Sequence, residues 1–79
     1  MDAIEKTVTT PDDELRAFAD QEPIMKFFVF GHLPLKLQDV SRSFATLAKQ
    51  MMELPRSAER AVALRKLLES KDAAVRAAL

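Results

Sequence analysis

Residues 26–44 gather several side chains that could bind a ligand, with the sequence KFFVFGHLPLKLQDVSRSF. Phenylalanines stand at positions 27, 28 and 30, directly before the only glycine and the only histidine of the chain. Aromatic rings can stack on nucleobases, and guanidinium or ammonium groups can contact phosphates. The candidate ligand-binding residues are Phe28, Phe30, His32, Arg42, Lys49, Arg60, Arg65 and Lys71. These residue types are suited to binding a compound that carries both aromatic rings and negative charge.

The same side chains also have a structural interpretation. Phenylalanines next to a helix start commonly belong to a core or an interface, and arginines on a helix face are usually solvated. His32, beside Leu33 and Pro34, can act as a capping or packing residue. Lys71 interrupts an apolar seam, where it could fix the register, extend its ammonium to water or face an anion held between subunits. Of these three roles, we favour extension to water.

Catalytic and metal-binding constellations are missing from the sequence. Its serines accompany a single histidine, on a chain too small to build a triad and an oxyanion hole readily. No Gly-rich phosphate loop is present, and one histidine without cysteine cannot form a usual structural zinc site. We therefore expect no catalytic residue, no metal and no cofactor, and a protein that is not an enzyme.

The composition predicts one small helical domain over residues 1–79. Hydrophobic residues make up 48% and charged residues 30% of the chain, and there is a single glycine. A chain of this length buries little surface, and without cysteine no disulfide can stabilise it. Oligomerisation is the remaining common route to stability.

Charge is distributed unevenly along the chain. Residues 1–22 hold seven acids and two bases, a net charge of −5, so the remaining residues carry +5. A basic body suits an anionic partner, although solvated helix faces often carry such an excess. Seven acids and no apolar core argue against a secretory signal in residues 1–22, and no stretch approaches the roughly 18 apolar residues of a membrane span. We expect a cytoplasmic protein without membrane contact.

The chain is divided by its prolines into three expected helices. Residues 1–9 show no periodicity and should fray, and Thr10 and Pro11 then start a short helix over about 11–20. Pro23 ends this part, and the following IMKFFVF segment could form a helical turn or an extended strand-like piece. A helix over 34–54 stops at Pro55, and Ser57 caps a last helix over about 58–77.

The two longer helices should form an antiparallel hairpin over 34–78. Apolar residues of the first are spaced three and four apart, which predicts a seam against the second: Leu37, Val40, Phe44, Leu47, Met51 and Leu54. Other apolar residues lie off this seam and need different cover: Phe27, Phe28, Phe30, Leu33, Leu35, Met52, Leu67 and Leu79. Leu15 and Phe18 of the short helix can shield some of them, and a second copy of the chain is the simpler way to bury the rest.

The order of these motifs resembles a family of phage-encoded helical-hairpin proteins that act as anti-CBASS and anti-Thoeris sponges. An aromatic residue is followed closely by His and Pro in FGHLP, and a helix and a Pro-containing turn lead to ERAVALRKLLESKDAAVRA. The resemblance covers roughly residues 27–78. It is most specific in the last helix, at Glu59, Ala63, Leu64, Lys66, Leu67 and Glu69.

The resemblance implies a hairpin that forms a homo-oligomer, typically a hexamer, in the cytoplasm of an infected bacterial host. Such proteins hold cyclic oligonucleotides or cyclic ADP-ribose-type signals at subunit interfaces without cleaving them. In the family an aromatic residue before the His-Pro bend stacks on a base, and Phe30 matches it best, with Gly31 as an extra residue. The family's phosphate-binding cation falls near Ala45 or Thr46, where this chain has none; Arg42 lies a turn before and Lys49 a turn after.

Two other functions fit the same sequence. The seams and phenylalanines could bind a protein partner, which would make the chain an interaction module. The basic face of the hairpin could instead contact RNA or DNA, in which case binding would depend steeply on salt.

Overall fold

The computed structural model describes residues 9–79, and within this range the chain is all-helical with no strand. It contains α1 (Pro11–Phe18), the short 3₁₀ helix η2 (Pro23–Phe28), α2 (Leu35–Met51) and α3 (Ala58–Ala77). The predicted all-α class is therefore confirmed, and the ambiguous IMKFFVF segment starts as helix and ends extended. Residues 1–8, most of the predicted frayed segment, lie outside the described residues.

Local capping signals fix where α1 and α3 begin. The Thr10 hydroxyl accepts a hydrogen bond from the Asp13 N–H at 3.0 Å, and the Asp13 carboxylate accepts one from the Thr10 N–H at 3.3 Å. This reciprocal pair is a capping box, with Pro11 at the first helical position. The Ser57 hydroxyl caps α3 by accepting from the Arg60 N–H at 3.0 Å. Both predicted helix starts are confirmed.

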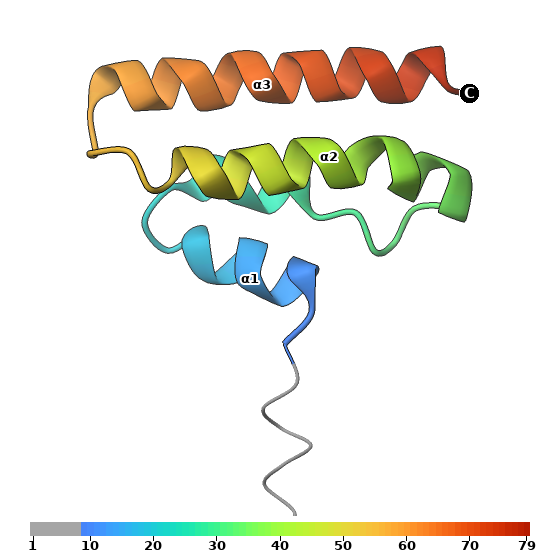
Figure 1. The fold of residues 1–79 in the computed structure, drawn as a ribbon, viewed down its shortest axis with the longest axis horizontal. Helices are drawn as coiled ribbons and strands as arrows, with labels where there is room; N and C mark the ends of the chain where they lie inside the picture. Colours follow the sequence, from blue (N-terminus) through green and yellow to red (C-terminus); the bar gives the residue numbers. More distant parts are fainter. Residues whose placement is uncertain (1–8) are drawn as a thin grey trace, which may run out of the picture.

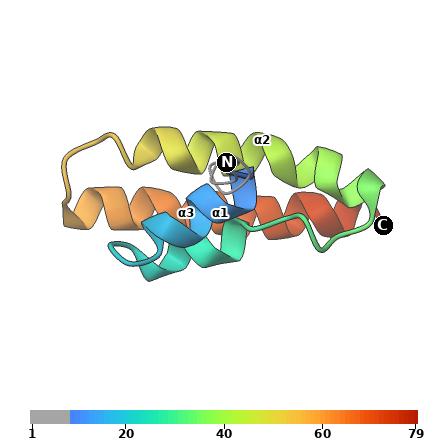
Figure 2. The same ribbon diagram turned by 90° about the horizontal axis from the view of Figure 1, so that it is seen from below.

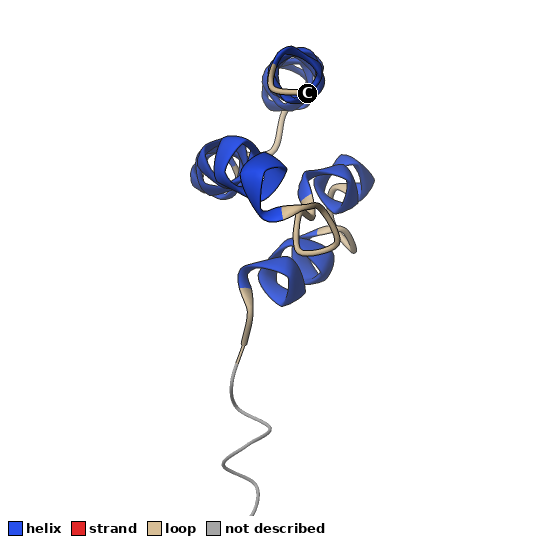
Figure 3. Ribbon diagram, turned by 90° about the vertical axis from the view of Figure 1, so that its right-hand side faces the viewer, coloured by secondary structure: helices blue, strands red, loops and turns tan. Residues whose placement is uncertain are grey.

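The two long helices, α2 and α3, form one layer, and the two short helices, α1 and η2, pack against it. Helices α2 and α3 lie side by side and run in opposite directions (Figure 1). Viewed end-on, η2 lies beside α2 beneath α3, and α1 lies below both (Figure 3). Helix η2 contacts each of the other three helices. From below, the segment after η2 runs along the pair towards the C-terminal end of α3 (Figure 2).

The core is centred on η2 rather than on the seam between α2 and α3. Its buried members come from all four helices and from the segments beside them: Leu15, Met25, Phe28, Phe30, Ala45, Ala48, Met52 and Leu64. Phe28, Leu15 and Met25 are among the largest fully buried side chains. Three of the off-seam apolar residues that we expected to need other cover, Phe28, Phe30 and Met52, are thus buried within this chain.

Helix α2 is buried along a different face from the predicted one. Leu37 is buried as expected, but its other buried residues are Ser41, Ala45 and Ala48. Ala45 and Ala48 belong to the core cluster together with Met25 and Phe28 of η2, and α2 contacts both η2 and α3. Small residues at such a contact let two backbones approach, and the apolar spacing alone did not reveal this second neighbour.

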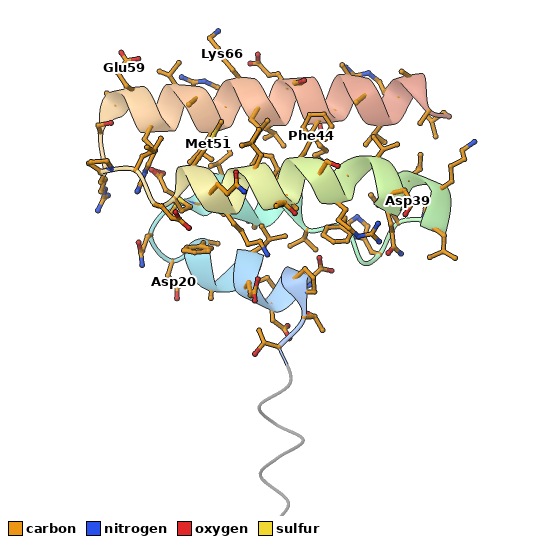
Figure 4. The ribbon with its side chains drawn as sticks, viewed as in Figure 1. Asp20, Asp39, Phe44, Met51, Glu59 and Lys66 are labelled. Atoms are coloured by element: carbon orange, nitrogen blue, oxygen red, sulfur yellow. The ribbon has the colours of Figure 1, made fainter. Side chains whose placement is uncertain are left out.

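The predicted α2 seam is only partly covered. Phe44 and Met51 point towards α3 (Figure 4) and are half-buried against the core. Leu47 and Leu54, in contrast, are 41% and 52% exposed. Helix α2 also ends at Met51 rather than Leu54, since the chain turns at residues 52–54. Within residues 9–79, no helix combines the length and apolar content needed to cross a membrane.

A buried guanidinium ties the α2–α3 turn to the α1–η2 connection. Arg60, only 6% exposed, donates from Nη1 to the Leu54 carbonyl at 2.9 Å and to the Met52 carbonyl at 3.3 Å. Its Nη2 lies 3.6 Å from Oε2 of Glu22, whose side chain is 15% exposed. One side chain thus joins the end of α2, the start of α3 and the segment that leads into η2.

We expect Arg60→Met to lower the free energy of unfolding by about 2–4 kcal/mol, because two carbonyls lose a buried donor and Glu22 loses its ion-pair partner. The matched control is Arg65→Met on the exposed face of α3, which should change stability by less than about 0.5 kcal/mol. Urea unfolding at one fixed protein concentration measures both. Equal small losses in the two variants would show that Arg60 is not a structural tie.

Candidate ligand-binding site

A cleft of about 400 Å³ lies between η2, the segment that follows it, and the C-terminal half of α3. We call it the η2–α3 cleft. Its polar and aromatic lining comes from Lys26, Phe27, His32, Lys71, Asp72 and Arg76. The volume falls within the range of small-molecule sites in proteins. Segments about forty residues apart in the sequence thus meet at one concave surface.

Positive charge prevails in the η2–α3 cleft. Three side chains, Lys26, Lys71 and Arg76, are cationic, and Asp72 is the one carboxylate among the lining residues. Lys71 is 14% exposed, and its Nζ lies 3.0 Å from Oδ1 of Asp72. The Lys26 ammonium lies 5.3 Å from the centre of the Phe27 ring, within cation–π distance. The cleft can therefore attract an anion beside an aromatic surface.

A second cleft, of about 350 Å³, lies at the start of α1 and beside α2. We call it the α1–α2 cleft, and its lining includes Asp12, Phe30, Gly31, Gln38 and Arg42. The Arg42 guanidinium lies 5.5 Å from the centre of the Phe30 ring. Here the ring is 6% exposed and is covered by a cation of the same chain.

Asp12 fixes the backbone that carries Phe30. Its carboxylate accepts hydrogen bonds from the N–H groups of Phe30 and Gly31, at 2.9 and 2.8 Å. A Cβ placed on Gly31 would lie 2.4 Å from Oδ2 of Asp12, so this approach requires glycine. Gln38 holds the other side of the bend, since its Nε2 donates to the Leu33 carbonyl at 2.7 Å. The bend is thus positioned by α1 and α2 together.

The structure brings four of the candidate residues together as two separate pairs. His32 and Lys71 line the η2–α3 cleft, and Phe30 and Arg42 line the α1–α2 cleft. Arg42 also pairs with Asp39, whose Oδ1 lies 2.8 Å from its Nη1. The residues that we expected to share one site therefore face two different surfaces of this chain.

The other four candidates lie away from both clefts. Phe28 is 1% exposed within the core, so its ring cannot stack on a ligand in this fold. Arg60 is buried and uses its guanidinium inside the chain. Lys49 pairs with Glu14 at 2.6 Å and joins α2 to α1. Arg65 is exposed on α3 and lines neither cleft.

The candidates chosen from the sequence omit four polar and aromatic residues of the η2–α3 cleft, although Phe27 is one of the three rings noted there as able to stack: Lys26, Phe27, Asp72 and Arg76. Two signals could have found them. Phe28 and Phe27 are consecutive in a helix, so burial of one directs the other to a different side. Asp72 and Arg76 are one turn apart on α3, and so are Lys71 and Val75, which places all four along one stripe.

The geometry of the η2–α3 cleft is suited to binding by charge and by stacking. Ammonium and guanidinium groups contact phosphate oxygens, and an exposed ring offers a face to a planar group. Within residues 9–79, no group of three His, Cys, Asp or Glu residues could hold a metal ion. No family model, curated protein or solved structure matches this chain. The cleft itself is therefore the main structural guide to function.

The Asp12–Gly31 contact generates a prediction that a double-mutant cycle can check. Gly31→Ala should cost about 1–2 kcal/mol of unfolding free energy, because the new Cβ displaces the carboxylate from two N–H groups. Gly31 does not have positive φ. In an Asp12→Ala background the same change should therefore be neutral or slightly stabilising. The coupling, measured by denaturant unfolding, should be about 1 kcal/mol or more, and additive losses would contradict it.

Proposed function

We propose that this protein is a phage immune-evasion sponge, which binds and sequesters a nucleotide second messenger of bacterial anti-phage defence without cleaving it. The ligand class is a cyclic oligonucleotide or a cyclic ADP-ribose-type signal. Support comes from the resemblance of residues 27–78 to the hairpin sponges. It comes also from the η2–α3 cleft, where three cations and an exposed phenylalanine ring converge.

The convergence in the η2–α3 cleft is the observation that carries this proposal. A sponge needs affinity and no chemistry, so cations for the phosphates and a ring for a base would be sufficient. Lys26 and Phe27 come from η2, and Lys71 and Arg76 come from α3. A solvated basic helix face would not require cations from distant segments to meet beside a ring.

A homo-oligomer belongs to the same proposal, and the resemblance favours a hexamer with an antiparallel hairpin as its unit. Four leucines remain exposed at the surface of the single chain: Leu35, Leu47, Leu54 and Leu79, at 76%, 41%, 52% and 81%. Burial of such side chains between copies would add apolar contact to a small core. Glu59 and Lys66 point away from α2 on the outer face of α3 (Figure 4), which keeps that part of the surface polar.

Ligand binding is tested by a thermal-shift screen with cyclic dinucleotides, cyclic trinucleotides and cyclic ADP-ribose isomers. A ligand present at a hundred times its Kd should stabilise the protein by about 2.7 kcal/mol. Chromatography of the ligand recovered after denaturation should show it unchanged. No stabilisation by any of these compounds would contradict the sponge function and favour a protein-interaction module, and steeply salt-dependent binding to RNA or DNA would favour the nucleic-acid alternative.

Assembly is tested by light scattering at micromolar concentration. We expect a mass that is a multiple of 8.9 kDa, because the exposed leucines favour contact between copies. Leu47→Gln, on the exposed side of α2, should shift the mass downward, whereas Thr46→Gln beside it should not if Leu47 makes the contact. A wild-type mass near 8.9 kDa would contradict the homo-oligomer.

A further inference from the structure

The two rings near the bend differ in how much surface they offer to a ligand. Each ring has a cation of this chain beside it, Arg42 at 5.5 Å for Phe30 and Lys26 at 5.3 Å for Phe27, but Phe30 is only 6% exposed, so little of its ring is open to a base. Phe27 is 54% exposed and lines the η2–α3 cleft. The ring available for stacking in this chain is therefore Phe27, three residues before the one that the sequence pattern favours.

The two clefts also differ in charge, and the difference again favours the η2–α3 cleft. The α1–α2 cleft contains one cation, Arg42, and one carboxylate, Asp12, and Arg42 is already paired with Asp39 outside the lining. The η2–α3 cleft contains three cations and one carboxylate, so its lining carries a formal charge of +2. An anion is therefore attracted to the η2–α3 cleft more than to the α1–α2 cleft.

We propose that the η2–α3 cleft holds a dianionic ligand with its phosphates against Lys71 and Arg76, beside Lys26, and with a base on Phe27. The ligand class is a compound with an aromatic base and two phosphate charges, as in a cyclic dinucleotide or a cyclised pyrophosphate. This assignment rests on the sponge function and names the site for it. The formal charge of the lining balances that of the ligand.

Asp72 has a distinct role in this site, as an internal anion that the ligand replaces. Its carboxylate lies 3.0 Å from the Lys71 ammonium, while the Lys71 side chain is only 14% exposed. The ammonium is therefore held in the cleft, and its nearest anion belongs to a side chain that is 48% exposed. An incoming phosphate takes over Lys71 and leaves Asp72 to water. Asp72 thus competes with the ligand for Lys71 and lowers the affinity of the cleft for anions.

Two probes separate the anion site from the stacking ring. Inorganic pyrophosphate supplies phosphate oxygens without a base, at a higher negative charge, and a cyclic dinucleotide such as 3′,3′-cyclic di-AMP supplies two phosphates together with bases. Amide chemical shifts of the full chain are followed during titration with each probe, in wild type and in Phe27→Ala, Lys71→Gln, Asp72→Asn and Arg42→Gln. Arg42→Gln is the matched control, since it removes the cation of the other cleft.

We expect both probes to shift the amides of residues 26–33 and 71–76. Asp72→Asn should tighten pyrophosphate binding about two- to fivefold, because it removes the competing carboxylate. Lys71→Gln should weaken the binding of both probes by at least that factor. Phe27→Ala should weaken the cyclic dinucleotide at least about fivefold and leave pyrophosphate unchanged, because only the base needs the ring. Arg42→Gln should leave both affinities unchanged.

Other outcomes overturn one proposal or both. Cyclic-dinucleotide binding that persists in Phe27→Ala and Lys71→Gln but is lost in Arg42→Gln overturns the site and leaves the sponge function standing. Pyrophosphate binding in the η2–α3 cleft, without binding of any cyclic nucleotide, supports the anion site and overturns the sponge function and the role of Phe27. If neither probe shifts the amides of residues 26–33 and 71–76, the site is overturned. Binding in the broader nucleotide screen then decides the sponge function separately.

Discussion

The buried guanidinium of Arg60 is the contact on which the relative placement of the helices depends. A helix end leaves its last carbonyls without partners, and Arg60 satisfies two carbonyls just beyond α2 from the first turn of α3. The same group reaches Glu22, one residue before η2. Its Nε has no hydrogen-bond partner within the described chain, so the group is held by its two terminal nitrogens. The turn between α2 and α3 and the residue before η2 thus meet at one side chain.

The position of η2 follows from that point and from the small residues of α2. Ala45 and Ala48 are 1% and 0% exposed where the core cluster packs, and larger side chains there would push η2 outward. With Met25 and Phe28 directed into the core, Phe27 is left on the outside of η2. The exposed ring in the η2–α3 cleft is therefore a consequence of how tightly η2 packs.

Features set by neighbouring residues could be predicted from the sequence, and features set by distant ones could not. The caps at Thr10 and Ser57 and the bounds of α3 depend on a few adjacent residues, and their prediction is confirmed. The burial of Arg60 depends on Glu22 and on a turn that only folding brings near, and arginine is exposed by default. For the same reason, the sequence did not predict the burial of Phe28 or of the second face of α2. For the candidate site, the residues chosen from the sequence include His32 and Lys71 but neither Lys26 nor Arg76, and they favour Phe28 and Phe30 over Phe27.

The absence of a cation at Ala45 follows from the same packing, whereas Thr46 beside it is exposed. The resemblance places a phosphate-binding residue near Ala45 or Thr46, but Ala45 is 1% exposed against the core, so a lysine or arginine there would displace the core or leave a charge buried. The C-terminal half of α3 extends beyond η2 (Figure 2), and its residues Lys71, Asp72, Val75 and Arg76 line the η2–α3 cleft. Lys71 and Arg76 thus lie outside the core cluster. The cations that line the η2–α3 cleft accordingly come from α3 and from Lys26 of η2 rather than from α2.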